Sequence, residues 1–316
     1  MFDVACIGIL VADVVTRTVR TLPESGKLTL VDHIDLFTGG CAMSSAIDMA
    51  RLGLRTAVSG KVGADGFGSF MRGALRQAGV EDLYVAEDPL VGTSASVVLV
   101  DAQGERSFLH SLGANAVFTD TDVPDTLLEQ SRITFVAGTM LMPALDGEAC
   151  ARVLRRAKAF GKITALDTAW DSKGRWMKVL APCMPHIDLF LPSYDEAMEL
   201  SGERDPVVIA DLFLGMGVQT VVIKLGGDGC LIRREGETWR IPGFHVKEVL
   251  DTTGAGDAFC AGFLTGVILG LSLPECGRMA NAVGALCVSG VGASTGIRSM
   301  EQVNELLAGN TASTGD

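Results

Sequence analysis

The stretch Asp251-Thr252-Thr253-Gly254-Ala255-Gly256-Asp257 leads directly into the longest apolar run of the chain, residues 258–273. This order predicts a loop followed by a buried helix. The first N–H groups of such a helix have no partner inside the helix and can hold an anion. A carboxylate in the first turn, Asp257, could take a proton from a hydroxyl group beside that anion. The same residues also fit an ordinary helix start, because aspartate there interacts favourably with the helix dipole.

The composition predicts a globular protein with a large apolar core. Hydrophobic residues make up 48% of the 316 residues and charged residues 20%, which is typical of a folded domain. We therefore expect one large α/β domain over residues 1–308 and a disordered tail at 309–316. The formal net charge of −12 argues against nucleic acids and acidic membranes as partners, because both attract a basic surface.

The eight cysteines predict neither a disulfide framework nor a metal site. They include no C-x-x-C pair and no zinc spacing with the four histidines, so reduced thiols in the cytoplasm are expected. The N-terminus lacks the early basic residue of a signal peptide. The apolar run 258–273 is shorter than the ~20 residues that cross a bilayer, and we interpret it as a core helix.

The order of elements predicts a three-layer α/β fold. Strand patterns such as residues 4–10 and 56–62 alternate with helical patterns such as 41–52 and 147–160. Strands separated by helices of this length indicate a mainly parallel sheet with helices on both faces. In such sheets ligands bind beyond the carboxyl ends of the strands.

Two segments, about 14–37 and 92–111, interrupt this alternation. Both contain β-branched and alternating sequence with turn signals and no helix-length run. We interpret them as hairpins of a small β-sheet that covers a site as a lid. Two loops without a function are the alternative, although long insertions in compact domains more often have one.

Two common nucleotide-binding motifs are absent from the sequence. The chain has no G-x-x-x-x-G-K-[ST] motif, which excludes a P-loop, and no G-x-G-x-x-G after the first strand. The second absence argues against a nicotinamide enzyme. The loop before residue 258 therefore has no competing phosphate motif.

Several motifs, in order along the chain, resemble those of the ribokinase-like (PfkB) carbohydrate kinases. The strongest are Gly254-Ala255-Gly256-Asp257 and the pair Gly39-Gly40 before a helix. Others are Gly104-Glu105-Arg106, Leu191-Pro192 with Glu196, Lys224-Leu225-Gly226 and Ala280-Asn281-Ala282. The similarity covers residues 2–307. It implies ATP-dependent phosphoryl transfer to a sugar-type hydroxyl group with Mg²⁺, a reaction that depends on positioning and charge stabilisation.

The resemblance implies a role for each motif. Asp257 is the general base, and the anion hole consists of Gly254, Ala255 and Gly256. The implied sugar-binding residues are Asp13, Gly39, Gly40, Ser44 and Arg106. The implied nucleotide-binding residues are Lys224, Gly226, Gly229 and Asn281. Glu196 acts on Mg²⁺ through water, and Asp251 and Thr253 are candidate ligands of a monovalent cation such as K⁺.

The residues by themselves leave alternatives for three of these roles. Asp13 also fits a strand-end cap, Arg106 an inert exposed arginine, and Glu196 a first-turn acid. Three positions depart from the family pattern. Ser44 and Ser193 stand where asparagine is usual, and Gly296 stands where a serine often closes the cation site.

The function that these patterns favour is a kinase for a free sugar or sugar-like polyol, with that sugar and ATP as its small-molecule partners. A nucleoside kinase of the same family and a catalytically weak, ligand-binding regulator are the alternatives. An intact Asp257 favours the enzyme, because a binding protein needs no base at this position. A homodimer formed through the lid would cover exposed sheet edges.

Overall fold

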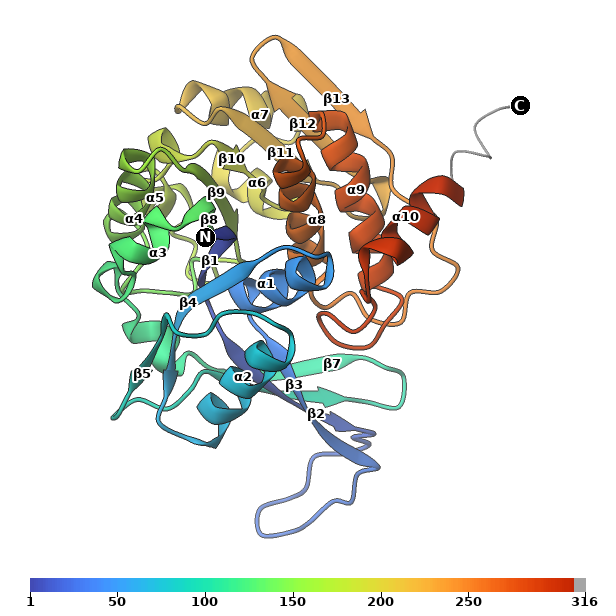
Figure 1. Ribbon diagram of the computed structural model, residues 1–316. Helices are drawn as coiled ribbons and strands as arrows, with labels where there is room; N and C mark the ends of the chain where they lie inside the picture. The colour runs from blue at the N-terminus through green and yellow to red at the C-terminus, as the bar shows by residue number, and fades with distance from the viewer. Residues whose placement is uncertain (310–316) are drawn as a thin grey trace.

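The computed structural model describes residues 1–309 as a large body with a small sheet at one side (Figure 1). The body is built around a nine-stranded sheet with the order β13-β12-β11-β10-β9-β8-β1-β4-β5. The last helix, α10 (Met300–Gly309), ends the described part of the chain. The tail that we predict at 309–316 lies, except for Gly309, outside the described residues.

The main sheet is mostly parallel, as predicted. All neighbouring strands from β5 to β11 in the order above run parallel, and β12 pairs antiparallel with both β11 and β13. The strands are β1 (Phe2–Gly8), β4 (Thr56–Gly63), β5 (Val85–Asp88), β8 (Ser131–Thr139), β9 (Ile163–Thr168), β10 (Leu189–Phe190), β11 (Thr220–Lys224), β12 (Cys230–Arg234) and β13 (Glu237–Ile241).

Helices cover both faces of this sheet, because alternate residues of the central strands point to opposite sides. In β11, Val221 and Ile223 belong to one buried cluster and Val222 to the other. One face packs against α3 (Asp125–Glu129), α4 (Glu148–Ala159), α5 (Met177–Leu180), α6 (Tyr194–Ser201) and α7 (Pro206–Gly215). The other packs against α1 (Cys41–Arg51), α2 (Gly66–Gln77), α8 (Ala255–Leu269) and α9 (Leu273–Cys287), with α10 outside α9. Short 3-10 helices are η1 (Gly113–Val117), η2 (Asp120–Asp122), η3 (Met184–His186) and η4 (Gly226–Asp228).

The predicted lid is a four-stranded mixed sheet below the body in Figure 1. Its order is β3 (His33–Gly39), β2 (Val11–Arg17), β6 (Ala95–Val100) and β7 (Arg106–Ser111), with β2 and β6 parallel. The sheet begins at Val11, earlier than the predicted boundary near residue 14. Asp13 therefore lies inside a lid strand and not at the end of β1. The unbroken apolar sequence from residue 4 to residue 11 hides the break between the two strands.

The apolar run 258–273 forms the predicted core helix over most of its length. Helix α8 ends at Leu269, before Gly270, which has a left-handed backbone (φ 76°), and Ser272 with Glu275 forms a capping box for α9, which begins at the last residue of the run. Glycine at a helix end and the serine-glutamate pair are the local signals for this break. Within residues 1–309, the structure contains no helix with the length and apolar character of a membrane span.

Close packing of α8 on α9 depends on glycine. A Cβ atom on Gly262 would lie 2.8 Å from Cα of Ala280. We expect Gly262→Ala to lower the free energy of unfolding by about 1–3 kcal/mol, because the two helices must move apart. Chemical denaturation measures this change.

Gly73 in α2 provides the matched control, because a Cβ atom there would meet no described atom within 4 Å outside its own helix backbone. Gly73→Ala should raise stability by up to about 1 kcal/mol, since alanine is the better helix former. Equal stabilisation by both substitutions would contradict the steric role of Gly262.

Candidate active site

The loop that ends at Gly254 fixes the start of helix α8. Gly254 has a left-handed backbone (φ 77°), and a Cβ atom there would lie 2.4 Å from the carbonyl oxygen of Ala293. Glycine alone suits both the conformation and the contact. The N–H of Ala255 donates to the carbonyl of Thr252 at 3.2 Å. The N–H groups of Gly256 and Asp257 are therefore the ones at this helix start that can donate hydrogen bonds to an anion.

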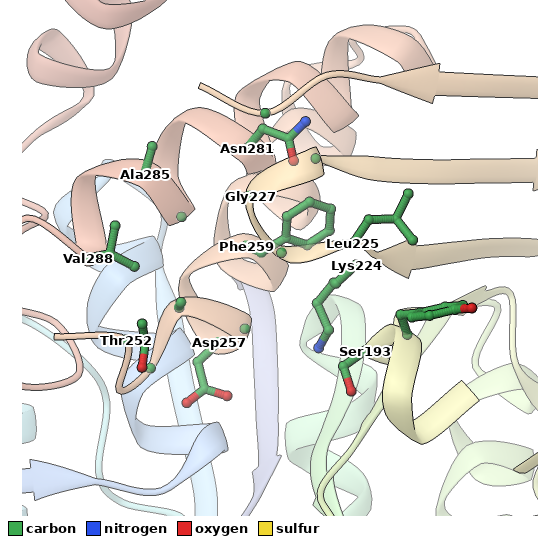
Figure 2. Close-up of a pocket in the computed structure, with 18 of the residues that line it drawn as sticks. Ser193, Lys224, Leu225, Gly227, Thr252, Asp257, Phe259, Asn281, Ala285 and Val288 are labelled. Atoms are coloured by element: carbon green, nitrogen blue, oxygen red, sulfur yellow. The ribbon is translucent and has the colours of Figure 1, made fainter. Parts of the chain in front are cut away.

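A cavity of about 1080 Å³ opens at this helix start (Figure 2). It lies at the carboxyl ends of β9 and β11, where a ligand is expected in a parallel sheet. Its lining combines the charged side chains of Asp257, Lys224 and Glu196 with apolar side chains that include Ala285 and Val288. Such a mixture suits a ligand with a flat apolar part and a charged part.

Asp257 is half-buried in the first turn of α8. Burial raises the pKa of its carboxyl group to about 6, although the positive charge of Lys224 opposes the rise. Burial, together with the neighbouring charge of Asp257, raises the pKa of the Cys41 thiol well above its usual value. Cys41 therefore stays a neutral thiol, whereas Asp257 is a carboxylate in the first turn of α8 that can accept a proton above pH 6.

Lys224, the last residue of β11, points toward the start of α8 (Figure 2). Its Nζ lies 2.7 and 2.8 Å from the two carboxylate oxygens of Asp167, and a Cβ atom on Gly256 would lie 3.4 Å from it. Burial lowers the pKa of Lys224, but the neighbouring negative charges, that of Asp167 first, together outweigh this effect and the net shift is upward. Lys224 is therefore a fixed positive charge beside Gly256.

Asp167 is a residue of this site to which the sequence motifs assigned no role. It is the penultimate residue of β9, is 2% exposed, and also accepts a hydrogen bond from the thiol of Cys260 at 3.3 Å. Its position was the available signal, because acids at the carboxyl ends of parallel strands face the ligand-binding edge. Its ion pair with Lys224 could not be predicted from local sequence, because the two residues lie on different strands.

Glu196 lies in the first turn of α6, on the opposite side of the cavity from α8. Its Oε2 atom accepts hydrogen bonds from the N–H of Ser193 and from the hydroxyl of Thr168, both at 3.0 Å. Ser193 in turn caps the helix by accepting from the N–H of Glu196. The carboxylate is thus held in one orientation, and its Oε1 atom has no hydrogen bond within residues 1–309. A hydrated Mg²⁺ fits such an oxygen.

The glycine turn after β11 packs against the segment that follows β13. Gly229 has a positive φ of 95°, and a Cβ atom there would lie 2.0 Å from the carbonyl oxygen of Ile241. The Nδ2 atom of Asn281 donates to the carbonyls of Ile241 and Pro242, both at 3.1 Å. Gly226, Gly229 and Asn281 all line the large cavity. Asn281 therefore shapes the cavity wall through the backbone of residues 241 and 242.

Asp13 and Gly39 lie side by side in the lid. The two strands pair so that a Cβ atom on Gly39 would lie 2.1 Å from Oδ2 of Asp13. Burial raises the pKa of Asp13 above its usual value. Gly40, with φ 92°, begins α1, and a Cβ atom there would lie 2.5 Å from the carbonyl oxygen of Ile9. The glycine pair thus leaves room for the Asp13 carboxylate and for a close backbone turn.

A second cavity of about 180 Å³ lies between the lid and the body. Asp13, Arg106, Asp251 and Thr253 line it, whereas Thr252 and Gly254 line the large cavity. The loop 251–254 is therefore a wall common to both cavities. Nη1 of Arg106 lies 2.5 Å from both Oδ1 of Asp251 and the hydroxyl oxygen of Thr253.

Ser44, like Gly39 and Gly40, is a predicted site residue that the structure does not place in either cavity lining. It is 1% exposed, and its hydroxyl group has no hydrogen bond within residues 1–309. The neighbouring Ser45 instead donates to the carbonyl oxygen of Asp257 at 3.2 Å. One helical position thus separates a buried hydroxyl group that bonds to the backbone of Asp257 from one without a hydrogen bond within residues 1–309.

Known proteins resemble this chain over nearly its whole length. Residues 1–300 match the pfkB family carbohydrate kinases. The chain is 28% identical to a 2-dehydro-3-deoxygluconokinase of Bacillus subtilis over 297 residues, which cover 90% of this chain and 91% of that protein. It is 27% identical to a ribokinase of Haemophilus influenzae over 290 residues, which cover 90% of this chain and 92% of that protein.

Two solved structures show the same architecture. Arabidopsis thaliana ribokinase complexed with ribose and ATP aligns with a TM-score of 0.85 and 25% identity, over 97% of this chain and 98% of that one. A putative E. coli ribokinase II in complex with ATP and Mg²⁺ aligns with a TM-score of 0.83 and 22% identity, over 98% and 99%. With its ribokinase-like fold and a family match from residue 1 to residue 300, this chain belongs to the PfkB family of carbohydrate kinases.

Proposed function

We propose that this protein transfers the γ-phosphoryl group of ATP to a hydroxyl group of a small sugar or sugar-like polyol, with Asp257 as the general base. The observation that carries the proposal is the placement of Asp257. It shares one helical turn with the free N–H groups of residues 256 and 257, at the edge of a cavity of about 1080 Å³. A base and an anion site so close together suit transfer of a phosphoryl group to a hydroxyl group.

The nucleotide would occupy the large cavity. The glycine turn at 226–229 and the wall formed by Asn281, Ala285 and Val288 would hold its base and ribose. Lys224 would stabilise negative charge on the phosphates beside Gly256, because its ammonium group stays charged. Glu196 would hold Mg²⁺ through water, and the ion would neutralise charge on the phosphates.

The acceptor would lie between Asp257 and the lid. Asp13 would supply an acceptor for sugar hydroxyl groups, and the missing side chains of Gly39 and Gly40 leave room for this carboxylate and for the turn into α1. Asp257 would take the proton of the attacking sugar hydroxyl group. The oxygen of that hydroxyl group would bond to the γ-phosphorus while the bond from phosphorus to the leaving ADP oxygen breaks. Burial and the lid would keep water from competing as an acceptor.

A ligand panel tests the proposed function. Pentoses, hexoses, sugar acids and nucleosides would be screened by thermal shift with a non-hydrolysable ATP analogue, and then for ADP release with ATP and Mg²⁺. A ligand that stabilises the protein only with nucleotide present indicates a ternary complex. Binding of a ligand without phosphorylation of any compound would instead favour a regulator.

Asp257→Asn should keep sugar and ATP binding while kcat falls by about 10²- to 10⁴-fold, the usual effect of removing a general base. Steady-state kinetics and calorimetric binding measure the two effects separately. Asp211→Asn is the control, because Asp211 is an exposed acid paired with Arg233 outside the large cavity. Near-normal turnover of Asp257→Asn would exclude Asp257 as the base.

The pH dependence should report the protonation of Asp257. The base is active when deprotonated, and its pKa is raised to about 6. Below this pH, kcat/KM for the sugar should fall by about tenfold per pH unit, and above it the value should level off. A rate that increases as the pH is lowered through 6 would contradict this assignment.

We also propose that two copies pair through the outer face of the lid. Leu36, Val14, Val97 and Leu109 are cross-strand neighbours in one row on the face opposite the small cavity. Leu36, Leu109 and the adjacent Ile34 are 39%, 65% and 67% exposed. A continuous apolar sheet face of this kind is typical of an interaction surface.

Leu109→Asp should convert the dimer into a monomer, because a carboxylate would be buried at the centre of the paired faces. Light scattering after gel filtration measures the change. Leu83→Asp is the matched control, because Leu83 is 75% exposed and lies outside the lid. A monomeric wild-type protein, or a Leu109→Asp variant that remains dimeric, would contradict the proposed interface.

A further inference from the structure

Arg106 connects the lid to the loop that precedes the anion site. It begins strand β7 of the lid, and its Nη1 atom lies 2.5 Å from Oδ1 of Asp251 and 2.5 Å from the hydroxyl oxygen of Thr253. Arg106 lies 145 positions before Asp251 in the sequence, so the contact joins two distant segments of the chain. The side chain of Asp251 is 5% exposed and that of Arg106 is 26% exposed. The ion pair is therefore largely shielded from water, where its attraction is stronger than at the surface.

Asp251 uses both carboxylate oxygens for hydrogen bonds. Oδ1 also accepts from the N–H of Thr253 at 2.7 Å, and Oδ2 accepts from the N–H of Gly292 at 2.8 Å. Burial would raise the pKa of Asp251, but the hydrogen bonds, that of Arg106 first, lower it to about 2. Asp251 is thus a carboxylate that joins the loop before α8 to the loop after α9, and the guanidinium group is its counter-ion.

These contacts do not fit the monovalent cation expected at Asp251 and Thr253. Both carboxylate oxygens and the threonine hydroxyl already contact N–H donors. A second positive charge at the same oxygens would be repelled by the guanidinium group. Gly296 has no side chain to add as a ligand, and a Cβ atom there would lie 2.1 Å from the carbonyl oxygen of Leu286.

We infer that Arg106 supplies the positive charge that orders the loop 251–254, so that catalysis by this protein requires no monovalent cation. Arg106 is then a positioning residue and not a sugar ligand. Its charge reaches the loop only when the lid lies against the body, and the loop leads directly into Gly254 and the anion site. Lid closure and ordering of the anion site thereby become one event. The kinetic consequences of this inference rest on the proposed function, whereas its consequences for thermal stability do not.

The kinetic test compares the wild type, Arg106→Gln and Arg106→Lys in tetramethylammonium, sodium and potassium chloride at constant ionic strength. Wild-type activity should vary by less than about twofold among the salts, since Arg106 already supplies the positive charge at the loop. Arg106→Gln should lower kcat by about 10²-fold with little change in KM for the sugar, because the anion site loses its position. K⁺ or added guanidinium should restore part of this activity, and Arg106→Lys should keep most of it.

Arg20→Gln is the control for the loss of one positive charge, because Arg20 is an exposed residue between β2 and β3. Its activity should equal that of the wild type in every salt. A wild-type enzyme that K⁺ activates by more than about tenfold would overturn the inference. A rise in KM for the sugar with unchanged kcat in Arg106→Gln would also overturn it, because Arg106 would then be a substrate ligand.

Melting temperatures provide a readout that needs no substrate. K⁺ should leave the wild-type melting temperature equal to that in tetramethylammonium and should raise that of Arg106→Gln, because a cation that binds only the folded loop stabilises it. An increase in the wild type by K⁺, or no increase in Arg106→Gln, would overturn the inference. If the ligand panel finds no phosphorylated compound, the proposed function fails, and the melting temperatures still decide the question about Arg106.

Discussion

The close approach of Gly254 to Ala293 fixes the start of helix α8, and the positions of Gly256 and Asp257 depend on it. The loop after α9 can approach Gly254 this closely because no Cβ atom intervenes. Close packing of α8 on α9 through Gly262 holds the same two segments together from the other side. The first two turns of α8 are therefore held between these two contacts, and Asp257 is directed into the cavity without a contribution from the ligand.

The balance of charge in the large cavity explains its expected need for Mg²⁺. Asp167, Glu196 and Asp257 bring carboxylates close to a single ammonium group, that of Lys224. Asp167 already compensates the charge of Lys224 through two short contacts. In a chain with a net charge of −12, a polyphosphate that enters this cavity meets little free positive charge from the protein. Backbone N–H groups and an ion that arrives with the nucleotide are then the effective counter-charges.

The sequence predicted the fold class because its signals are local and repeated. Alternating strand and helix patterns indicated the parallel sheet, and the irregular segments indicated the lid. Most of the site residues that the motifs named line one of the two cavities, such as Asp257, Lys224 and Asp13. The pairs Lys224–Asp167 and Arg106–Asp251 could not be predicted, because each depends on which strands and loops become neighbours. The place of Ser44 outside both cavities could not be predicted for a related reason, since one helical position decides which side chain contacts Asp257.

The loop 251–254 is a single stretch of chain with a cavity on each side. Asp251 and Thr253 face the small cavity, and Thr252 and Gly254 line the large one. Neighbouring residues of this wall thus face different cavities. A substitution on the lid side is therefore expected to shift the surface of the large cavity as well, because only one residue separates the two. A wall one residue thick in this way makes the shapes of the two cavities depend on each other.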